Sequence, residues 1–205
     1  TVVRHFKWMK ENDIDGVWVQ RFTTPHYGLT EPTNRVLMNC RKGAETYGRV
    51  FVVMYDISNN KASTLVEDIK NDWMHLVEVI KITESPRYLR HKGKPLVSIW
   101  GFGCDGRPGT PEQAATLINW FQKDAPAKYQ ATFMGGVNGS TGSSHWSLQP
   151  EPWASVFRSM DVISPWTVGR YSDTTSADSW QQNTIIPDIA IAAAAGKDYL
   201  PVIWP

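Results

Sequence analysis

The chain has 205 residues, of which 41% are hydrophobic and 20% charged, and its formal net charge is +1. These values are typical of a globular protein with one domain, expected here to span residues 1–205. Charges of both signs are interspersed, so a nucleic-acid partner is not expected, and no apolar run approaches the roughly 18 residues that a membrane span needs.

Helix and strand patterns alternate along the first half of the chain. Apolar residues at helical spacing in VVRHFKWMKEND precede the apolar run GVWVQRF, which predicts a helix and then a buried strand. A second helix is expected over about residues 33–47, ending at Gly48, before RVFVVMYD. Thr64 and Glu67 indicate a capping box for a third helix, which is followed by the strand PLVSIWGFG.

The second half continues the alternation. Thr110, Pro111 and Gln113 form a strong helix start before EQAATLINWFQK, and the strand ATFMGGV follows. A loop rich in Gly, Ser and Asn leads to the helix WASVFRSM and the strand DVISPWTVG. The last helix is expected to be broken by Pro187 and to end at Gly196 before DYLPVIWP. Six strands are therefore expected to begin near residues 16, 50, 95, 131, 161 and 199.

Continuous apolar strands without alternation predict a parallel sheet buried on both faces, in the α/β class. An open doubly wound sheet is the alternative. The first strand-to-helix connection lacks a glycine-rich dinucleotide motif, and the long loops follow strands, which favours a (β/α)₈ TIM barrel. Because the sequence begins within a helix and stops after a strand, we expect six of the eight strand-helix units, strands 2 to 7, with one strand missing at each end.

In such a barrel the ligand-binding face lies at the carboxyl ends of the strands. This sequence places aromatic rings and polar donors there, a combination that suits the C–H faces and hydroxyls of sugars. The candidate substrate-binding residues are Gln20, Arg21, Tyr55, Trp100, His145, Trp146, Trp166, Arg170 and Trp204. For Trp100, Trp166 and Trp204, packing in the top layer of the barrel stays an equal alternative. Helical Trp8, Trp73 and Trp120 and mid-strand Trp18 are expected to pack in the core.

Asp56 is the one acid at a strand end and the catalytic candidate. It is also the expected partner of Arg21, in a pair that could be structural. A glycosidase usually needs two carboxyl groups, and Asp105, in a loop, is a weaker second candidate. The principal acids are therefore expected beyond Pro205.

Other chemistries find little support in the sequence. The five histidines are dispersed, so no metal site is expected. Cys40 lies on a helical apolar stripe and is expected to be a buried thiol, whereas Cys104 has only Arg107 to activate it and is not expected to be catalytic. The triplet that begins at Asn138 is a possible glycosylation acceptor, which favours a secreted or extracellular glycoprotein.

Several phrases carry a family resemblance over essentially the whole chain: HFKWMKENDIDGVWVQRF, GRVFVVMYDIS, SPRYLRHKGKPLVSIWGFG, GTPEQA, MGGV, HWSLQ, DVISPWTVGRY and DYLPVIWP. They resemble glycoside hydrolase proteins grouped with families 71 and 99, described as xylosidases or arabinosidases. The resemblance implies a (β/α)₈ barrel, no cofactor, and glycan binding or hydrolysis at the strand ends. The relatives usually have Gly where this chain has Asp13.

Carried over by motif, the resemblance assigns site roles to Gln20, Arg21, Tyr55, Asp56, Trp100, His145, Trp166 and Arg170. It also places an acidic motif on the strand after Pro205. The predicted function is a glycoside hydrolase acting on an α-linked glycan, with an oligosaccharide or polysaccharide and the remainder of its own chain as partners. The alternative is a lectin-like or structural glycoprotein that binds carbohydrate on the same scaffold.

Overall fold

The computed structural model describes residues 1–23, 30–137, 146 and 149–203. Its centre is a seven-stranded sheet of order β1-β2-β4-β5-β6-β7, in which these strands run parallel and β3 pairs antiparallel with β4. The strands are β1 Gly16–Arg21, β2 Val50–Asp56, β3 Arg90–His91, β4 Lys94–Trp100, β5 Thr132–Val137, β6 Val162–Pro165 and β7 Asp198–Tyr199. The six expected strands are confirmed, and only the short β3 is an addition.

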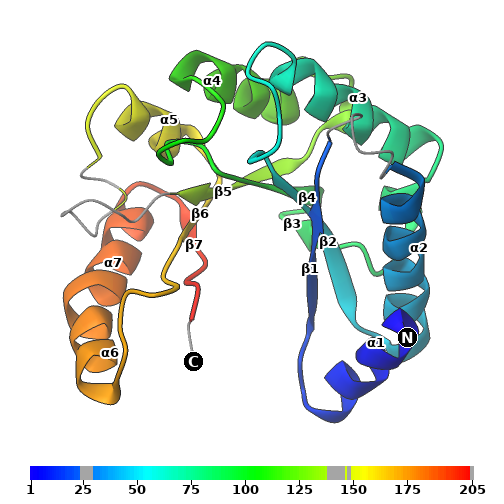
Figure 1. Ribbon diagram of the computed structural model, residues 1–205, viewed down its shortest axis with the longest axis horizontal. Helices are drawn as coiled ribbons and strands as arrows, with labels where there is room; N and C mark the ends of the chain where they lie inside the picture. The colour runs from blue at the N-terminus through cyan, green and yellow to red at the C-terminus, as the bar shows by residue number, and fades with distance from the viewer. Residues whose placement is uncertain (24–29, 138–145, 147–148, 204–205) are drawn as a thin grey trace.

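Helices connect the parallel strands and cover one face of the sheet. They are α1 Val2–Glu11, α2 Thr30–Tyr47, α3 Leu65–Glu78, α4 Pro111–Asn119, α5 Trp153–Ser159, α6 Thr174–Trp180 and α7 Ile186–Ala194, with short turns η2 Ile82–Glu84, η3 Trp120–Asp124, η4 Ala127–Tyr129 and η6 Gln181–Ile185. Figure 1 shows the sheet curving as the inner wall of an arch whose outer wall is helical. This confirms the α/β alternation, and within the described residues the barrel is not closed between β1 and β7.

The core lies between the sheet and the helices. Phe51, Val53 and Ile99 point from the strands into it, where they meet Trp73 of α3 and Phe121 of η3, and all five side chains are fully buried. Each such side chain contributes roughly 1.5–3 kcal/mol by leaving water. The indole N–H of Trp73 donates to the Tyr129 carbonyl at 2.8 Å, so its one polar group is satisfied.

The tryptophan expectations have mixed outcomes. Trp73 is buried as predicted, and Trp120 is partly buried against the core. The prediction for Trp8 is wrong, because 52% of its surface is exposed and its ring stacks only on His5 of the same helix. Helix α1 packs on α2 with the opposite face, from which Phe6 is buried against Gly43. Trp18 is half-buried at the edge strand β1.

Two of the predicted helix ends are confirmed by the structure, and a third is wrong. Thr110 and Gln113 form the expected capping box, with N···O distances of 3.3 and 3.0 Å. Gly48, at the expected helix end, adopts the left-handed conformation at φ 68°, and so does Asp13, at φ 54°, where the relatives usually have Gly. The capping box at Thr64 is wrong: its backbone, at φ −118° and ψ −5°, is not extended, and its hydroxyl donates to Asp68 instead, at 2.8 Å.

The expected break at Pro187 takes a milder form. The helical path from α6 passes through the wider turn η6 and continues into α7, with Pro187 in the first turn of α7. Pro187 has no N–H to donate to an earlier carbonyl, and the path passes this point through the wider turn rather than ending there. No described helix combines the length and the apolar character required to cross a membrane.

Candidate functional site

A hollow of about 490 Å³ opens at the carboxyl ends of the strands, and we call it the strand-end hollow. Strand pairing explains its wall, since residues in register on parallel neighbours face the same side: Gln20 lies opposite Met54, and Asp56 lies opposite Trp100. The loop after β4 and the residue after β6 complete it. The lining residues are Gln20, Met54, Asp56, Trp100, Gly101, Cys104, Asp105, Arg107 and Trp166.

The carboxylate of Asp56 is held in one orientation. Gln20 donates its amide N–H to Oδ2 at 2.8 Å, and Ser58 donates to Oδ1 from its backbone N–H at 2.9 Å and from its hydroxyl at 2.5 Å. These donors are all neutral, and within the described residues Asp56 forms no ion pair. A carboxylate accepts about four hydrogen bonds, which leaves room for a ligand donor.

Two indoles stand beside this acid. The rings of Trp100 and Trp166 meet edge to face, with centroids 4.9 Å apart and planes at 74°. Trp166 is 45% exposed, so part of its surface is open to solvent. Gly136 makes the arrangement possible, because a Cβ atom at that position would come within 1.9 Å of the Trp100 ring. The hollow therefore has an aromatic wall next to a fixed acid.

The loop that follows β4 turns sharply at glycines. Gly101, at φ 115°, is an example: a side chain there would be strained and would also press on Ile57. The loop brings Asp105 and Arg107 to the hollow, and with them Cys104. Burial raises the pKa of the Cys104 thiol; Arg107 lowers it, while Asp105 and Asp56 raise it further. The raised pKa disfavours the thiolate, which is the nucleophilic form of cysteine.

Arg21 and Tyr55 do not reach the strand-end hollow. Successive side chains of a strand alternate between faces, so these two point from β1 and β2 towards the helices, opposite to Gln20 and Asp56. The expected pairing of Arg21 with Asp56 is wrong. Its guanidinium binds Asp72 of α3 through two hydrogen bonds of 2.6 Å.

Asp72 is the centre of a network that sequence reasoning missed. Tyr55 donates its hydroxyl hydrogen to Asp72 at 2.8 Å, and Arg21 also donates to Asn34 at 2.8 Å. Burial disfavours the charge of Arg21, but its hydrogen bonds to Asp72 and the carboxylate's charge outweigh that effect and raise its pKa. Burial likewise raises the pKa of Tyr55, and the neighbouring Asp72 charge adds to the shift. The sequence did contain an indication of this network, since Asp72 lies among the apolar positions of its helix.

Two further sequence candidates, Trp146 and Arg170, do not line the hollow. Trp146 is buried, and its indole N–H has no hydrogen-bond partner among the described residues. Arg170 is half-buried and does not line the hollow. His145, Trp204 and the possible glycosylation acceptor Asn138 lie outside the described residues. The part of the chain that the structure describes contains no group of three His, Cys, Asp or Glu side chains placed to hold a metal ion.

The fold and the hollow together define an α/β scaffold of the (β/α)-barrel type with a ligand-sized space at its strand ends. No protein-family model matches the sequence, and no curated protein matches it. The structure is similar to that of the GH99 endo-alpha-mannosidase from Bacteroides thetaiotaomicron, with a TM-score of 0.69 and 16% identity, covering 100% of this chain and 53% of that chain.

A second structure of this Bacteroides enzyme, in complex with BIS-TRIS-propane, gives the same TM-score at 15% identity and is covered to 55%. The chain thus spans about half the length of these solved structures. At this identity the likeness establishes the fold alone, a (β/α)-barrel scaffold similar to that of these structures.

Proposed function

We propose that the protein is a glycoside hydrolase that acts on an α-linked glycan held in the strand-end hollow. The observation that carries the proposal is that the fixed carboxylate of Asp56 and the partly exposed indole residue Trp166 line the same hollow. A pyranose ring can stack its C–H face on an indole and donate hydrogen bonds from its hydroxyls to a carboxylate. The hollow contains an indole and a carboxylate within one space. Its volume of about 490 Å³ lies in the range of small-ligand sites.

The scaffold supports the same proposal. The GH99 endo-alpha-mannosidase shares its fold and is named for action on an α-linked sugar, so α-mannosides are the first glycans to try. Within the described residues, Asp56 and Asp105 are the two acids that line the hollow. We assign Asp56 to binding a substrate hydroxyl and to local charge balance. The acids that cleave the bond are proposed to lie beyond Pro205, as is an extracellular location for the protein.

The experiment compares the complete protein with three of its variants. Asp56→Asn keeps the shape of the side chain but removes its charge, Trp166→Ala removes the partly exposed indole, and Asp178→Asn is the control, an exposed acid on α6. Release of reducing ends from a panel of α-linked oligosaccharides, α-mannosides included, reports hydrolysis. Calorimetric titration with the same sugars reports binding.

We expect Asp56→Asn to lower turnover roughly 10- to 100-fold, because a hydrogen bond to a charged group contributes about 1.5–3 kcal/mol. Trp166→Ala should weaken binding about tenfold, and Asp178→Asn should change neither readout. Unchanged kinetics in Asp56→Asn would remove its functional role. Saturable binding with no cleavage of any glycan would favour the alternative, a carbohydrate-binding protein without catalysis.

A further inference from the structure

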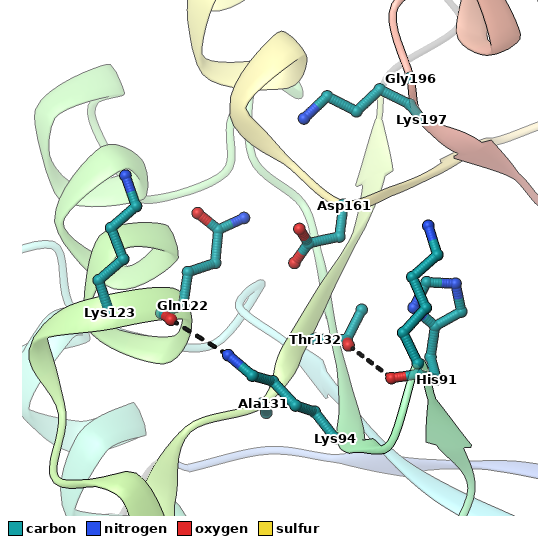
Figure 2. A pocket seen from close by; sticks show the side chains of 10 residues that line it. His91, Lys94, Gln122, Lys123, Ala131, Thr132, Asp161, Gly196 and Lys197 are labelled. Carbon is teal, nitrogen blue, oxygen red and sulfur yellow. Dashed lines mark hydrogen bonds between the residues drawn. The ribbon is translucent and has the colours of Figure 1, made fainter.

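A second hollow, of about 320 Å³, opens at the amino ends of strands β4 to β7, the opposite end of the sheet from the strand-end hollow (Figure 2). We call it the basic hollow. Its charged and titratable lining consists of His91, Lys92, Lys94, Lys123, Asp161 and Lys197. Four lysines thus face one carboxylate, so the space has a strong excess of positive charge although the whole chain is almost neutral.

Part of this charge is compensated inside the protein. Lys92 forms an ion pair with Asp198 at 2.8 Å, and the Nε2 atom of His91 lies 2.7 Å from the same carboxylate. Asp161 accepts the backbone N–H of Phe133 at 2.9 Å. The one acid of the hollow therefore has a local role at the start of β5, and none of the lysines is within ion-pair distance of it among the described residues.

Three ammonium groups remain without a counter-charge. Lys94 makes only long contacts with neutral acceptors, the carbonyl of Gln122 at 3.5 Å and the side chain of Gln130 at 3.4 Å. In the part of the chain that the structure describes, Lys123 and Lys197 have no ion pair. The three lysines come from separate elements, the start of β4, the turn η3 and the residue before β7, and they surround the same space (Figure 2).

Helix ends account for only part of this arrangement. Lys123 lies in the last turn of its helix and Lys197 follows α7, where cations stabilise the helix dipole by about 0.3–1 kcal/mol. That role explains each of these two lysines separately. It does not explain Lys94, which begins a strand, or why all three residues line one hollow.

We propose that the basic hollow binds an oxyanion of the phosphate or sulfate type. Lysine ammonium groups act as hydrated point charges that bind phosphate oxygens, and several of them around one space suit a multivalent anion. The volume is near the lower end of the range for ligand sites and accommodates a free anion or one ester group on a sugar. The inference does not depend on the glycan proposal, because the two hollows share no lining residue.

Calorimetric titrations of the complete protein test the site with three probes: inorganic phosphate, glucose 6-phosphate and uncharged glucose. The variant Lys123→Gln/Lys197→Gln removes two charges of the basic hollow. The control Lys10→Gln/Lys42→Gln removes two exposed charges from α1 and α2, and Lys10, like Lys123, lies in the last turn of its helix. Preference between the first two probes distinguishes a free anion from an ester, and glucose reports any affinity for the sugar itself.

We expect saturable phosphate binding that is retained in the control, is weakened at least tenfold in Lys123→Gln/Lys197→Gln, and declines as sodium chloride is raised, since salt screens charge interactions. Equal binding by the two double variants, or no saturable binding by the unaltered protein, overturns the proposal. If the double variant unfolds, NMR of the unaltered protein tests the site instead. Phosphate is then expected to shift the amide signals of Thr132 and Gly196, which line the basic hollow. Shifts confined to other regions contradict the site.

Discussion

Arg21 and Asp72 form a bidentate ion pair, with both N···O distances at 2.6 Å, and the side chains are only 3% and 13% exposed. It joins the carboxyl end of β1 to α3. Removing one charge of such a pair leaves the other buried and uncompensated. We therefore expect Asp72→Asn to lower the free energy of unfolding by about 3–5 kcal/mol, measured by urea denaturation.

The control for this substitution lies on the same helix. Glu67 is exposed, and its carboxylate lies 3.8 Å from the Lys70 ammonium group, which makes a weak surface ion pair. Glu67→Gln should therefore change stability by less than about 0.5 kcal/mol. If the two variants unfold at the same urea concentration, Arg21 does not depend on Asp72 for its burial.

Two adjacent glycines test the aromatic wall of the strand-end hollow. Gly136→Ala places a methyl group in the Trp100 ring, whereas Gly135→Ala, on the other face of β5, places it against the sulfur of Met160. Both should cost roughly 1–3 kcal/mol by overpacking. Only Gly136→Ala should alter the near-ultraviolet circular dichroism of the Trp100–Trp166 pair. The same spectrum for both variants would show that Trp100 does not lie over Gly136.

The helix starts at Thr110 and Thr64 look alike in sequence but differ in structure. The hydroxyl of Thr110 accepts a hydrogen bond from the backbone N–H of Gln113, whereas the hydroxyl of Thr64 accepts none from its helix. Thr110→Ala is therefore expected to cost about 1 kcal/mol of stability, and Thr64→Ala clearly less, because it loses only an exposed hydrogen bond to Asp68. Thermal unfolding of the two variants side by side measures the difference, and a larger loss at Thr64 would refute the assignment.

The buried thiol of Cys40 predicts a loss of stability in alkali. Burial raises its pKa to about 11, while in the unfolded chain the thiol titrates near its ordinary value of about 8.5. At pH values below the pKa of the unfolded chain the thiol is protonated in both states, so its full contribution to stability is present. As pH rises towards 11 the unfolded chain loses its proton first, and stability falls. Urea unfolding from pH 7 to 10.5 should show a steeper decline for the unaltered protein than for Cys40→Ala. Parallel declines would contradict this account.

Hydrophobic runs predicted the strands well, because burial in a parallel sheet depends on local composition. The sequence also placed Asp56, Trp100 and Trp166 at strand ends, and the structure brings these three together. The start of each strand and the glycine at position 48 were likewise predictable, since they rest on local backbone chemistry.

The face on which a strand-end residue lies was harder to predict. Arg21 and Tyr55 were grouped with Gln20 and Asp56 because all four end a strand, but the apolar runs gave no alternation from which to tell the two faces apart. The true partner, Asp72, is 51 residues from Arg21 along the chain, and the contact depends on how α3 lies on the sheet. Local patterns carry no information about such packing.

Alternation along β1 and β2 also allows the two faces of these strands to change independently. Positions 20, 54 and 56 face the strand-end hollow, while positions 21, 53 and 55 face the helices. Substitutions at the even-numbered positions can therefore accumulate without disturbing the interior, and a related chain could acquire a new ligand preference while keeping the same fold. An insertion of one residue in either strand would turn each of these side chains to the opposite face, so the wall of the hollow and the packing against the helices would be lost together.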